Sequence, residues 1–442
     1  MAEGLQQGGI GDQGRVGAMR WAARGLLAQL PPFTRRQWQV FSVCGIGGFF
    51  DNYDRSLLSL CLRDIQLGLG IAEAQVGRML SVIRLGSLGA FLLSPLADVF
   101  GRRRLLLIAI AGYTVFTCLS AVTLQSAVFV GWQCLARCFA GAQGIVALVV
   151  LVEEVNAEVR GWAIGLLGVV VLTGWGLAAL FFALIQYLPF GWRTLYLPAL
   201  LPLMFLRPLA RLLPETWRFQ RVRSEDSSPL RLVRPLGEML TVYPTRLGMT
   251  VTVSFLYTLG GNAVTFFYPK YLLEVHHWSP PQVTALVIFG GLIGISGNLV
   301  AGRLSDLVGR RYLASLLMIL APLSALWIFR ARGAGVIPAW TLELFLDTAA
   351  GTIVGVYSAE LFPTSYRSAA AGAMMAAGTL GGALGLFVES WLYHRVGSHW
   401  EAVQWLVGFW FFAALVIFLF FPETAGVELE AISPGRVAGS ED

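Results

Sequence analysis

Apolar runs of about twenty residues recur along the whole chain, and no other feature limits its fold as strongly. A helix needs about 20 predominantly apolar residues to cross the hydrocarbon core of a bilayer. Only 13% of the 442 residues are charged, compared with about 25% in an average soluble domain. The pattern predicts an all-α membrane protein with twelve transmembrane helices, near residues 38–62, 76–96, 105–124, 127–151, 162–187, 193–213, 246–272, 282–302, 312–330, 336–359, 368–390 and 402–421.

The arginines between these runs predict how the chain is oriented. Loops on one side of the predicted membrane hold many more arginines than loops on the other, and such loops face the cytoplasm. Both termini are then cytoplasmic, and we expect the protein in the plasma (inner) membrane, surrounded by lipid. The net charge of +6 is spread over these short loops. It therefore indicates topology and not a nucleic-acid partner.

Three charged motifs occur twice with nearly the same spacing, which predicts two homologous six-helix halves. The second Asp-x-x-Gly-Arg-Arg motif begins at Asp306, 208 residues after Asp98 (306 − 98). The repeated motifs are Asp98 to Arg103 with Asp306 to Arg311, Glu153 and Arg160 with Glu360 and Arg367, and Pro214 to Thr216 with Pro422 to Thr424. Parallel repeats of this kind build transporters whose substrate site lies between the halves at mid-depth. We expect a tail over 1–37, bundles over 38–213 and 246–421, a cytoplasmic linker over 214–245 and a tail over 422–442.

The same motifs resemble those of the major facilitator superfamily. The second Asp-x-x-Gly-Arg-Arg loop carries the full signature from Gly302, whereas the first has Ser94 where the family usually has glycine. The run from Tyr357 to Thr364 and the motif from Pro422 to Thr424 resemble the sugar-porter and organic-ion branch. The resemblance implies a two-bundle fold and transport by alternating access. We expect a monomer without a cofactor.

The charged loop motifs are predicted to act as a conformational latch. Each loop aspartate can accept hydrogen bonds from the start of the next helix while its arginines face carboxylates, and such clusters would hold the two halves together in the outward-open state. The alternative is that these are only charges that orient the chain. The predicted latch residues are Asp98, Arg102, Arg103, Glu153, Arg160, Asp306, Arg310, Arg311, Glu360 and Arg367.

A few ionisable residues fall inside the predicted spans, where each costs about 2.5–3.5 kcal/mol on insertion scales and so marks a pathway or proton relay. In the N-terminal half, Asp51, Asp54, Arg84 and Arg137 fall in one depth band. Because a buried charge without a partner is far more costly than a paired one, we expect pairing.

The sequence around these charges resembles known proton-coupled carriers. The run from Asp51 to Asp54 resembles the D-G-x-D signature of aromatic-acid:proton symporters, with Asn52 in place of glycine. Proton-coupled sugar symporters pair a similar aspartate with an arginine in an R-x-x-x-G motif, which stands here from Arg137 to Gly141. The resemblance implies that Asp54, with Asp51 nearby, couples transport to protons and that Arg137 is its partner. A static ion pair is the alternative.

The predicted seventh span argues against a sugar. Hexose porters carry a Q-Q-x-x-G-I-N run there, and this chain keeps only Gly260 and Asn262 of it. Glu343 and Asp347 share one face of a helix and could bind a cation or a second proton, or face loop water. The four histidines are expected in solvated loops, with no metal site. The candidate substrate-binding residues are Arg84, Asn262, Tyr257, Trp175, Glu343 and Asp347.

These observations favour a secondary active transporter, a proton-coupled symporter of a small organic acid or related organic solute. The alternatives are a facilitator or efflux carrier for a sugar or organic cation, and a non-transporting membrane sensor on the same scaffold. The sequence has no nucleophile elbow, metal motif or phosphate-binding loop, so an enzyme is not expected.

Overall fold

The computed structural model describes residues 33–156, 159–212, 237–363 and 366–425. Most of the predicted tails and linker lie outside these residues. Every regular element in the described part is helical. The N-terminal half contains α2 (Arg35–Leu60), α3 (Leu62–Gly68), α4 (Glu73–Leu85), α5 (Gly89–Leu93), α6 (Leu96–Phe100), α7 (Arg102–Ala121), α8 (Ser126–Glu154), α9 (Arg160–Phe182), α10 (Trp192–Leu195), α11 (Leu201–Met204) and α12 (Leu206–Leu212). The C-terminal half contains α15 (Pro244–Glu274), α16 (Pro280–Ala285), α17 (Gly291–Val308), α18 (Arg310–Ile328), α19 (Val336–Glu360), α20 (Arg367–Val396), α21 (His399–Val407) and α22 (Phe409–Phe420).

The described helices agree with the predicted twelve-helix fold. Ten of them, counted with their short continuations, are long and apolar enough to cross a membrane. The first predicted span corresponds to α2, which has 26 residues and contains three charged residues in its second half. The sixth corresponds to α10, α11 and α12. Pro198 lies between α10 and α11, and Pro202 and Pro208 lie in the first turns of α11 and α12. Proline has no backbone N–H to donate and so interrupts a helix.

The sequence repeat produces the same local structure in both halves, as predicted. The chain leaves α6 at Gly101 with φ 98° and ψ 139°, and it leaves α17 at Gly309 with φ 100° and ψ 140°. A positive φ of this size is accessible to glycine and rarely to other residues. The next residue begins a helix in each half, and Arg102 forms an ion pair with Glu153 as Arg310 does with Glu360. The two halves are therefore pseudo-symmetric.

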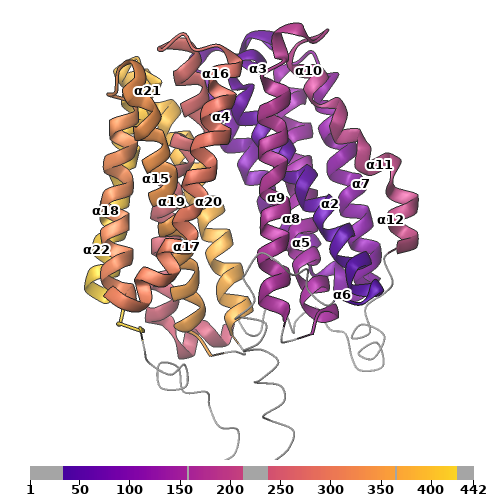
Figure 1. Ribbon diagram of the computed structural model, residues 1–442, viewed down its shortest axis with the longest axis vertical. Helices are drawn as coiled ribbons and strands as arrows, with labels where there is room; N and C mark the ends of the chain where they lie inside the picture. The colour runs from indigo at the N-terminus through magenta and orange to yellow at the C-terminus, as the bar shows by residue number, and fades with distance from the viewer. Residues whose placement is uncertain (1–32, 157–158, 213–236, 364–365, 426–442) are drawn as a thin grey trace, which may run out of the picture.

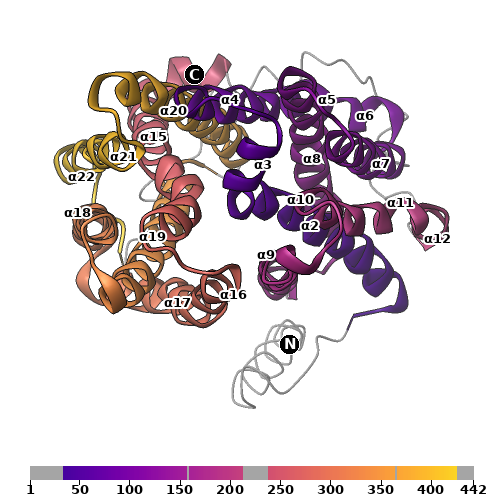
Figure 2. The same ribbon diagram turned by 90° about the horizontal axis from the view of Figure 1, so that it is seen from above.

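The two halves stand side by side and pack together at one end (Figures 1 and 2). We call this the sealed end; it carries α3, α16 and α21. The opposite end, which carries the turns at Gly101 and Gly309, is the motif end. Seen from above, α4 lies beside α20 and α9 beside α16. Hydrogen bonds join these elements across the halves, from Ser81 Oγ to the Ala383 carbonyl at 2.7 Å and from Thr284 Oγ1 to the Ala179 carbonyl at 2.6 Å.

The distribution of buried apolar residues agrees with closure at the sealed end. One large hydrophobic cluster includes residues of both halves, such as Leu80 and Ile83 of α4 with Phe267 of α15 and Leu386 of α20. The buried clusters nearer the motif end each belong to one half. Because the two halves share a hydrophobic core at one end only, a cavity can lie between them on the other side of that core.

Candidate functional site

An ion-paired layer crosses the middle of the N-terminal half. Arg137 of α8 pairs through Nη2 with Asp54 Oδ2 of α2, and its Nη1 lies 3.8 Å from Asp51 Oδ1. Only 1% of Asp54 and 5% of Arg137 is exposed. Gln133, one turn before Arg137, accepts a hydrogen bond from its guanidinium at 3.2 Å. The structure thus brings together the three residues predicted to couple transport to protons.

A second arginine completes this layer and was given no role in the sequence analysis. Arg55 Nε donates to Asp51 Oδ1 at 3.0 Å, and its Nη2 lies 3.0 Å from Oδ2, so the contact is bidentate. Bidentate arginine–carboxylate pairs are strong and fix the geometry of both side chains. The two aspartates are therefore matched by two guanidinium groups.

Arg84 is a third guanidinium at this level and has no acidic partner among the described residues. It lies in the last turn of α4, and its Nε is buried without a hydrogen-bond partner. The side chain lies against Gly382 of α20 and beside Asn262 of α15. When both aspartates are ionised, two carboxylates stand against three guanidinium groups, which leaves one surplus positive charge, and Arg84 is the guanidinium without a carboxylate partner.

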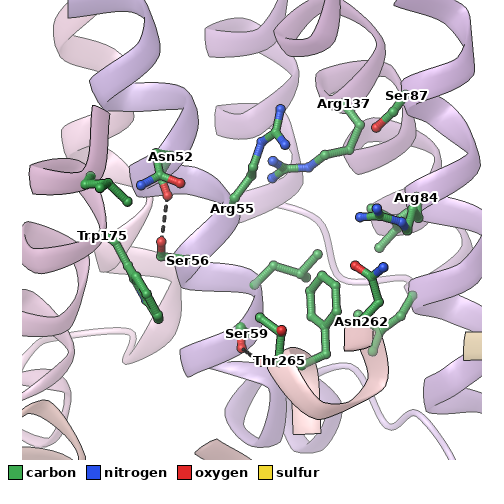
Figure 3. Close-up of a pocket in the computed structure, with 15 residues that line it drawn as sticks. Asn52, Arg55, Ser56, Ser59, Arg84, Ser87, Arg137, Trp175, Asn262 and Thr265 are labelled. Carbon is green, nitrogen blue, oxygen red and sulfur yellow. Dashed lines mark hydrogen bonds between the residues drawn. The ribbon is translucent and has the colours of Figure 1, made fainter. Parts of the chain in front are cut away.

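A cavity of about 330 Å³ opens beside these arginines (Figure 3). Arg84 and Asn262 lie next to one another on one side of it, and Trp175 lies on the opposite side in this view. The predicted substrate residues Arg84, Asn262 and Trp175 all line it. Further polar and aromatic lining residues are Asn52, Arg55, Ser56, Ser59, Ser87, Thr265 and Phe266.

Most of the lining residues that sequence analysis missed follow a helical pattern. Asn52, Arg55, Ser56 and Ser59 recur at spacings of three and four along α2, and Thr265 and Phe266 follow Asn262 in the same way along α15. Residues at these spacings share one face of a helix. A polar stripe on a membrane-spanning helix was thus the signal that could have identified them.

A second cavity of about 490 Å³ continues from the first toward the motif end. It shares Arg55, Arg84 and Ser87 with the first and extends to Ile145 and Met374. Tyr257, another predicted substrate residue, lines this second cavity. The site is therefore continuous with the motif end, whereas the shared hydrophobic core covers it from the sealed end.

Glu343 and Asp347 lie behind Tyr257 and line neither of these two cavities. The Tyr257 hydroxyl donates to Asp347 Oδ1 at 2.6 Å. Glu343 is only 7% exposed, so the expectation that this pair could face loop water is wrong. The reason is that α19 packs both side chains into the C-terminal half.

The described latch residues form contacts within each half. Besides the pairs of Arg102 and Arg310 given above, Arg310 Nη2 lies 3.3 Å from Asp306 Oδ1, and Arg367 Nε donates to the Phe362 carbonyl at 3.2 Å. Arg103 donates to the Ala210 carbonyl. Nε of Arg160 and of Arg311 is buried without a hydrogen-bond partner. The side chain of Asp98 lies outside the described residues.

Glu423, in the repeated Pro-Glu-Thr motif, caps the start of α18. Its Oε1 accepts from the backbone N–H of Arg310 at 2.8 Å, and its Oε2 accepts from that of Arg311 at 3.1 Å. The N–H groups of Thr424 and Ala425 also donate to Oε1, each at 3.0 Å. Partial burial raises the pKa of Glu423, but these backbone hydrogen bonds together outweigh it and hold the pKa below its usual value.

One histidine contradicts the expectation of solvated loops. His277 and His394 are exposed, but His399 is only 4% exposed. It begins α21 at the sealed end, where its ring stacks on Phe267 and Tyr393 with centroid distances of 4.8 and 4.3 Å. Packing between α15 and α20 therefore buries it. The described residues contain no group of three or more side chains suited to bind a metal.

Known proteins resemble the chain over most of its length. A sequence model of the Major Facilitator Superfamily matches residues 44–346 and 250–436. The chain is 25% identical over 417 residues to a probable 4-methylmuconolactone transporter of Cupriavidus pinatubonensis, over 90% of this chain and 93% of that protein. It is 25% identical over 354 residues to a putative niacin/nicotinamide transporter of Bacillus subtilis, over 79% of this chain and 87% of that protein. The xylose transporter XylE of E. coli has a similar fold, with a TM-score of 0.73 at 18% identity over 90% of this chain and 99% of XylE.

Proposed function

Because the chain belongs to the major facilitator superfamily and is a membrane transporter, not an enzyme, we propose that it carries a small organic acid by proton-coupled symport. The observation that carries this proposal is the surplus positive charge of Arg84 in the cavity wall. Arg84 is half-buried and its Nε is buried without a hydrogen-bond partner, so its guanidinium is partly desolvated without compensation. A substrate carboxylate would supply the missing partner, and the planar guanidinium suits bidentate binding of a carboxylate.

The shape and lining of the cavity favour an acid that carries a ring or another flat apolar body. Trp175 and Phe266 supply aromatic surface, while Asn52, Asn262 and Thr265 supply a few hydrogen-bonding groups. Pockets of this kind bind mostly through apolar contacts and fix orientation through a small number of polar ones. The names of the relatives above, which include 4-methylmuconolactone and niacin, support a small ring compound with an acidic group.

Asp54 is the proposed site of proton coupling. Its carboxylate is buried and has Arg137 as its counter-charge. If the substrate anion or a movement of α8 draws Arg137 away, an ionised Asp54 is left without a partner and protonation becomes favourable. Occupancy by substrate and by a proton are then linked, and such a linkage is reciprocal.

The direction of the cavity fits alternating access. By the positive-inside rule the arginine-rich motif end faces the cytoplasm, as do both termini. The sealed end is then extracellular, and we infer that a cavity open toward the motif end corresponds to an inward-facing state. In this state the ion pairs of Arg102 and Arg310 lie within their own halves. In the outward-facing state we expect the latch residues to meet across the closed motif end.

Transport into proteoliposomes tests the proposal. Benzoate and its neutral analogue benzamide differ in charge but little in shape, so they report on the need for an anion. Because uncharged benzoic acid and benzamide also cross a bare bilayer, uptake is taken as the excess over protein-free liposomes. We expect the excess uptake of benzoate to exceed equilibrium only with an inward proton gradient and that of benzamide to be small. Uptake of benzamide, xylose or an organic cation in preference to benzoate would instead favour the facilitator or efflux alternatives. Binding of acids without any transport would favour the sensor.

A further inference from the structure

A cluster of buried and partly exposed polar side chains joins the two halves at the sealed end. Lys270 of α15 is the only lysine in the chain and is 0% exposed. Its Nζ donates to Gln66 Oε1 of α3 at 2.6 Å and forms an ion pair with Glu73 of α4. Within its own helix, Lys270 lies 3.9 Å from Glu274. Through this hydrogen bond and this ion pair, the ammonium of Lys270 links the C-terminal half to the N-terminal half.

His399 lies in the same cluster and contacts two carboxylates at once. Its Nδ1 is 2.5 Å from Glu389 Oε1 of α20, and its Nε2 is 2.9 Å from Glu73 Oε2. Glu389 is 0% exposed. Because Glu73 belongs to the N-terminal half and Glu389 to the C-terminal half, the imidazole bridges the two halves only while this end is closed.

The hydrogen-bond geometry requires one more proton than the ordinary charge states supply. A neutral imidazole has a single N–H, whereas both ring nitrogens here face a carboxylate oxygen within hydrogen-bond distance. Either the imidazole carries a second proton or one of the two carboxyl groups is protonated. With that proton on the imidazole, the two positive charges of Lys270 and His399 balance the two negative charges of Glu73 and Glu389. Without it, the cluster keeps one uncompensated negative charge, which is costly because Glu389 is fully buried, although 43% of the Glu73 side chain is exposed.

The remaining groups that face the cluster do not replace this proton. Glu274 also lies near Lys270, but Arg63 of α3 stands 3.8 Å from it and balances its charge. The Tyr393 ring stacks on the imidazole and adds no charge. A metal cation at Glu73 would be repelled by the ammonium of Lys270, which already pairs with that carboxylate.

We propose that Glu73, Glu389 and His399 form a second proton-binding site, separate from Asp54, that is filled when the sealed end closes. Opening this end separates α4 from α20 and α21, so the imidazole loses one of its two acceptors and releases the proton. Binding and closure are reciprocal. This inference rests on the alternating-access part of the proposed function, and with the proposed orientation it makes extracellular acid favour the inward-facing state.

Distance measurements on the intact protein test the site. Nitroxide labels at Tyr187→Cys and Val275→Cys, two exposed positions at the sealed end on opposite halves, report closure by pulsed EPR. The five native cysteines are first replaced. As pH falls from about 8 to about 5.5, we expect the ratio of closed to open molecules to rise by up to tenfold per unit, the limit for one proton.

Two variants and one matched control make the test specific. In Glu389→Gln, the amide can donate to Nδ1 of a neutral imidazole, so closure should no longer depend on pH. His399→Gln leaves the buried Glu389 without the imidazole as its partner, so closure should still take up a proton, but with its midpoint moved to another pH. His394→Gln removes an exposed histidine of the neighbouring α20 and should keep the wild-type profile. A wild-type closed fraction that does not change with pH, or an unchanged titration in both Glu389→Gln and His399→Gln, would overturn the proposal.

The same assay in Asp54→Asn separates this site from the proposed coupling site. If the two are independent, Asp54→Asn loses uphill uptake but keeps the pH-dependent closure. If Asp54→Asn alone abolishes the titration of closure, the second site does not exist as proposed. A failure of Asp54→Asn to affect uptake would contradict the proposed function and leave the closure experiment intact.

Discussion

Gly382 of α20 lies directly against the guanidinium of Arg84 of α4, across the boundary between the two halves. A Cβ at residue 382 would stand 2.3 Å from Arg84 Nε and 2.4 Å from Asn262 Nδ2. Real Cβ atoms do not approach this closely, so a side chain here has to displace the arginine or the amide. The position of the proposed substrate-binding cation thus depends on a residue in the other half.

Gly382→Ala should therefore weaken substrate binding without a direct contact to substrate. Overpacking typically costs about 1–3 kcal/mol, so we expect the Kd for benzoate to rise by roughly tenfold to a hundredfold. Isothermal calorimetry in detergent measures it. Gly372→Ala is the matched control, because it lies on the same helix and a Cβ there meets nothing within 4 Å. An equal loss in both variants would point to a general effect on α20.

Arg84→Ala should remove affinity for acids selectively. A hydrogen bond to a charged group contributes about 1.5–3 kcal/mol, so benzoate should bind roughly tenfold to a hundredfold more weakly. Benzamide, which does not need the cation, should bind almost as it does to the wild type. Arg395→Ala, an exposed arginine at the end of α20, serves as control. If Arg84→Ala weakened both ligands equally, the arginine would have a structural role and not an anion-binding one.

The fold and the central ion pair could be predicted because each follows from a local rule. Apolar runs of sufficient length must span the bilayer, and charges within such runs must find partners at the same depth. Asp54 and Arg137 are 83 residues apart in sequence, yet the depth argument and the family resemblance were enough to pair them.

The polar cluster at the sealed end could not be predicted in this way. Glu73 and His399 are separated by 326 residues, and each stands at the first turn of its helix, where a polar side chain is ordinarily solvated. Phe267 and Tyr393, from the same half as His399, enclose its imidazole. Glu73, whose side chain is 43% exposed, reaches that imidazole only when the two halves assemble. Neither apolar periodicity nor loop composition carries that information.

Asp306→Asn should slow the change between inward-facing and outward-facing states. Asp306 is exposed at the motif end and pairs with Arg310, far from the cavity that contains Arg84. The exchange rate of labelled benzoate should fall several-fold while its Kd stays within about twofold. The equivalent Asp98→Asn change in the first repeat should have the same effect. Weaker binding at a normal exchange rate would contradict a role in state switching.

Glu423→Gln should lower stability at neutral pH but not in acid. The folded-state pKa of Glu423 is lowered, so its carboxylate stabilises the fold above the unfolded pKa of about 4.3, and this contribution disappears as pH falls through the folded value. An anion at a helix N-terminus contributes about 0.3–1 kcal/mol, and partial solvent exposure favours the low end. Thermal unfolding in detergent should show a lower Tm for the variant at pH 7, and the difference should shrink as the pH falls below about 4.3. A difference that persists in acid would indicate that charge is not the cause.

Asp54→Asn should separate transport from its driving force. The amide resembles the protonated acid in shape and charge, so the variant can pass through both states but cannot gain or lose the coupling proton. Uphill accumulation of benzoate driven by an inward proton gradient should be lost, while exchange of benzoate across membranes at equal pH should continue at a rate within a few-fold of the wild type.

The single variant Arg137→Lys should also lose coupling, because an ammonium does not reproduce the planar, multiply donating guanidinium. Glu401→Gln, which changes an exposed carboxylate at the start of α21, is the control and should still concentrate benzoate. If Asp54→Asn still concentrates benzoate against its gradient, Asp54 is a static partner of Arg137 and the coupling proton binds elsewhere.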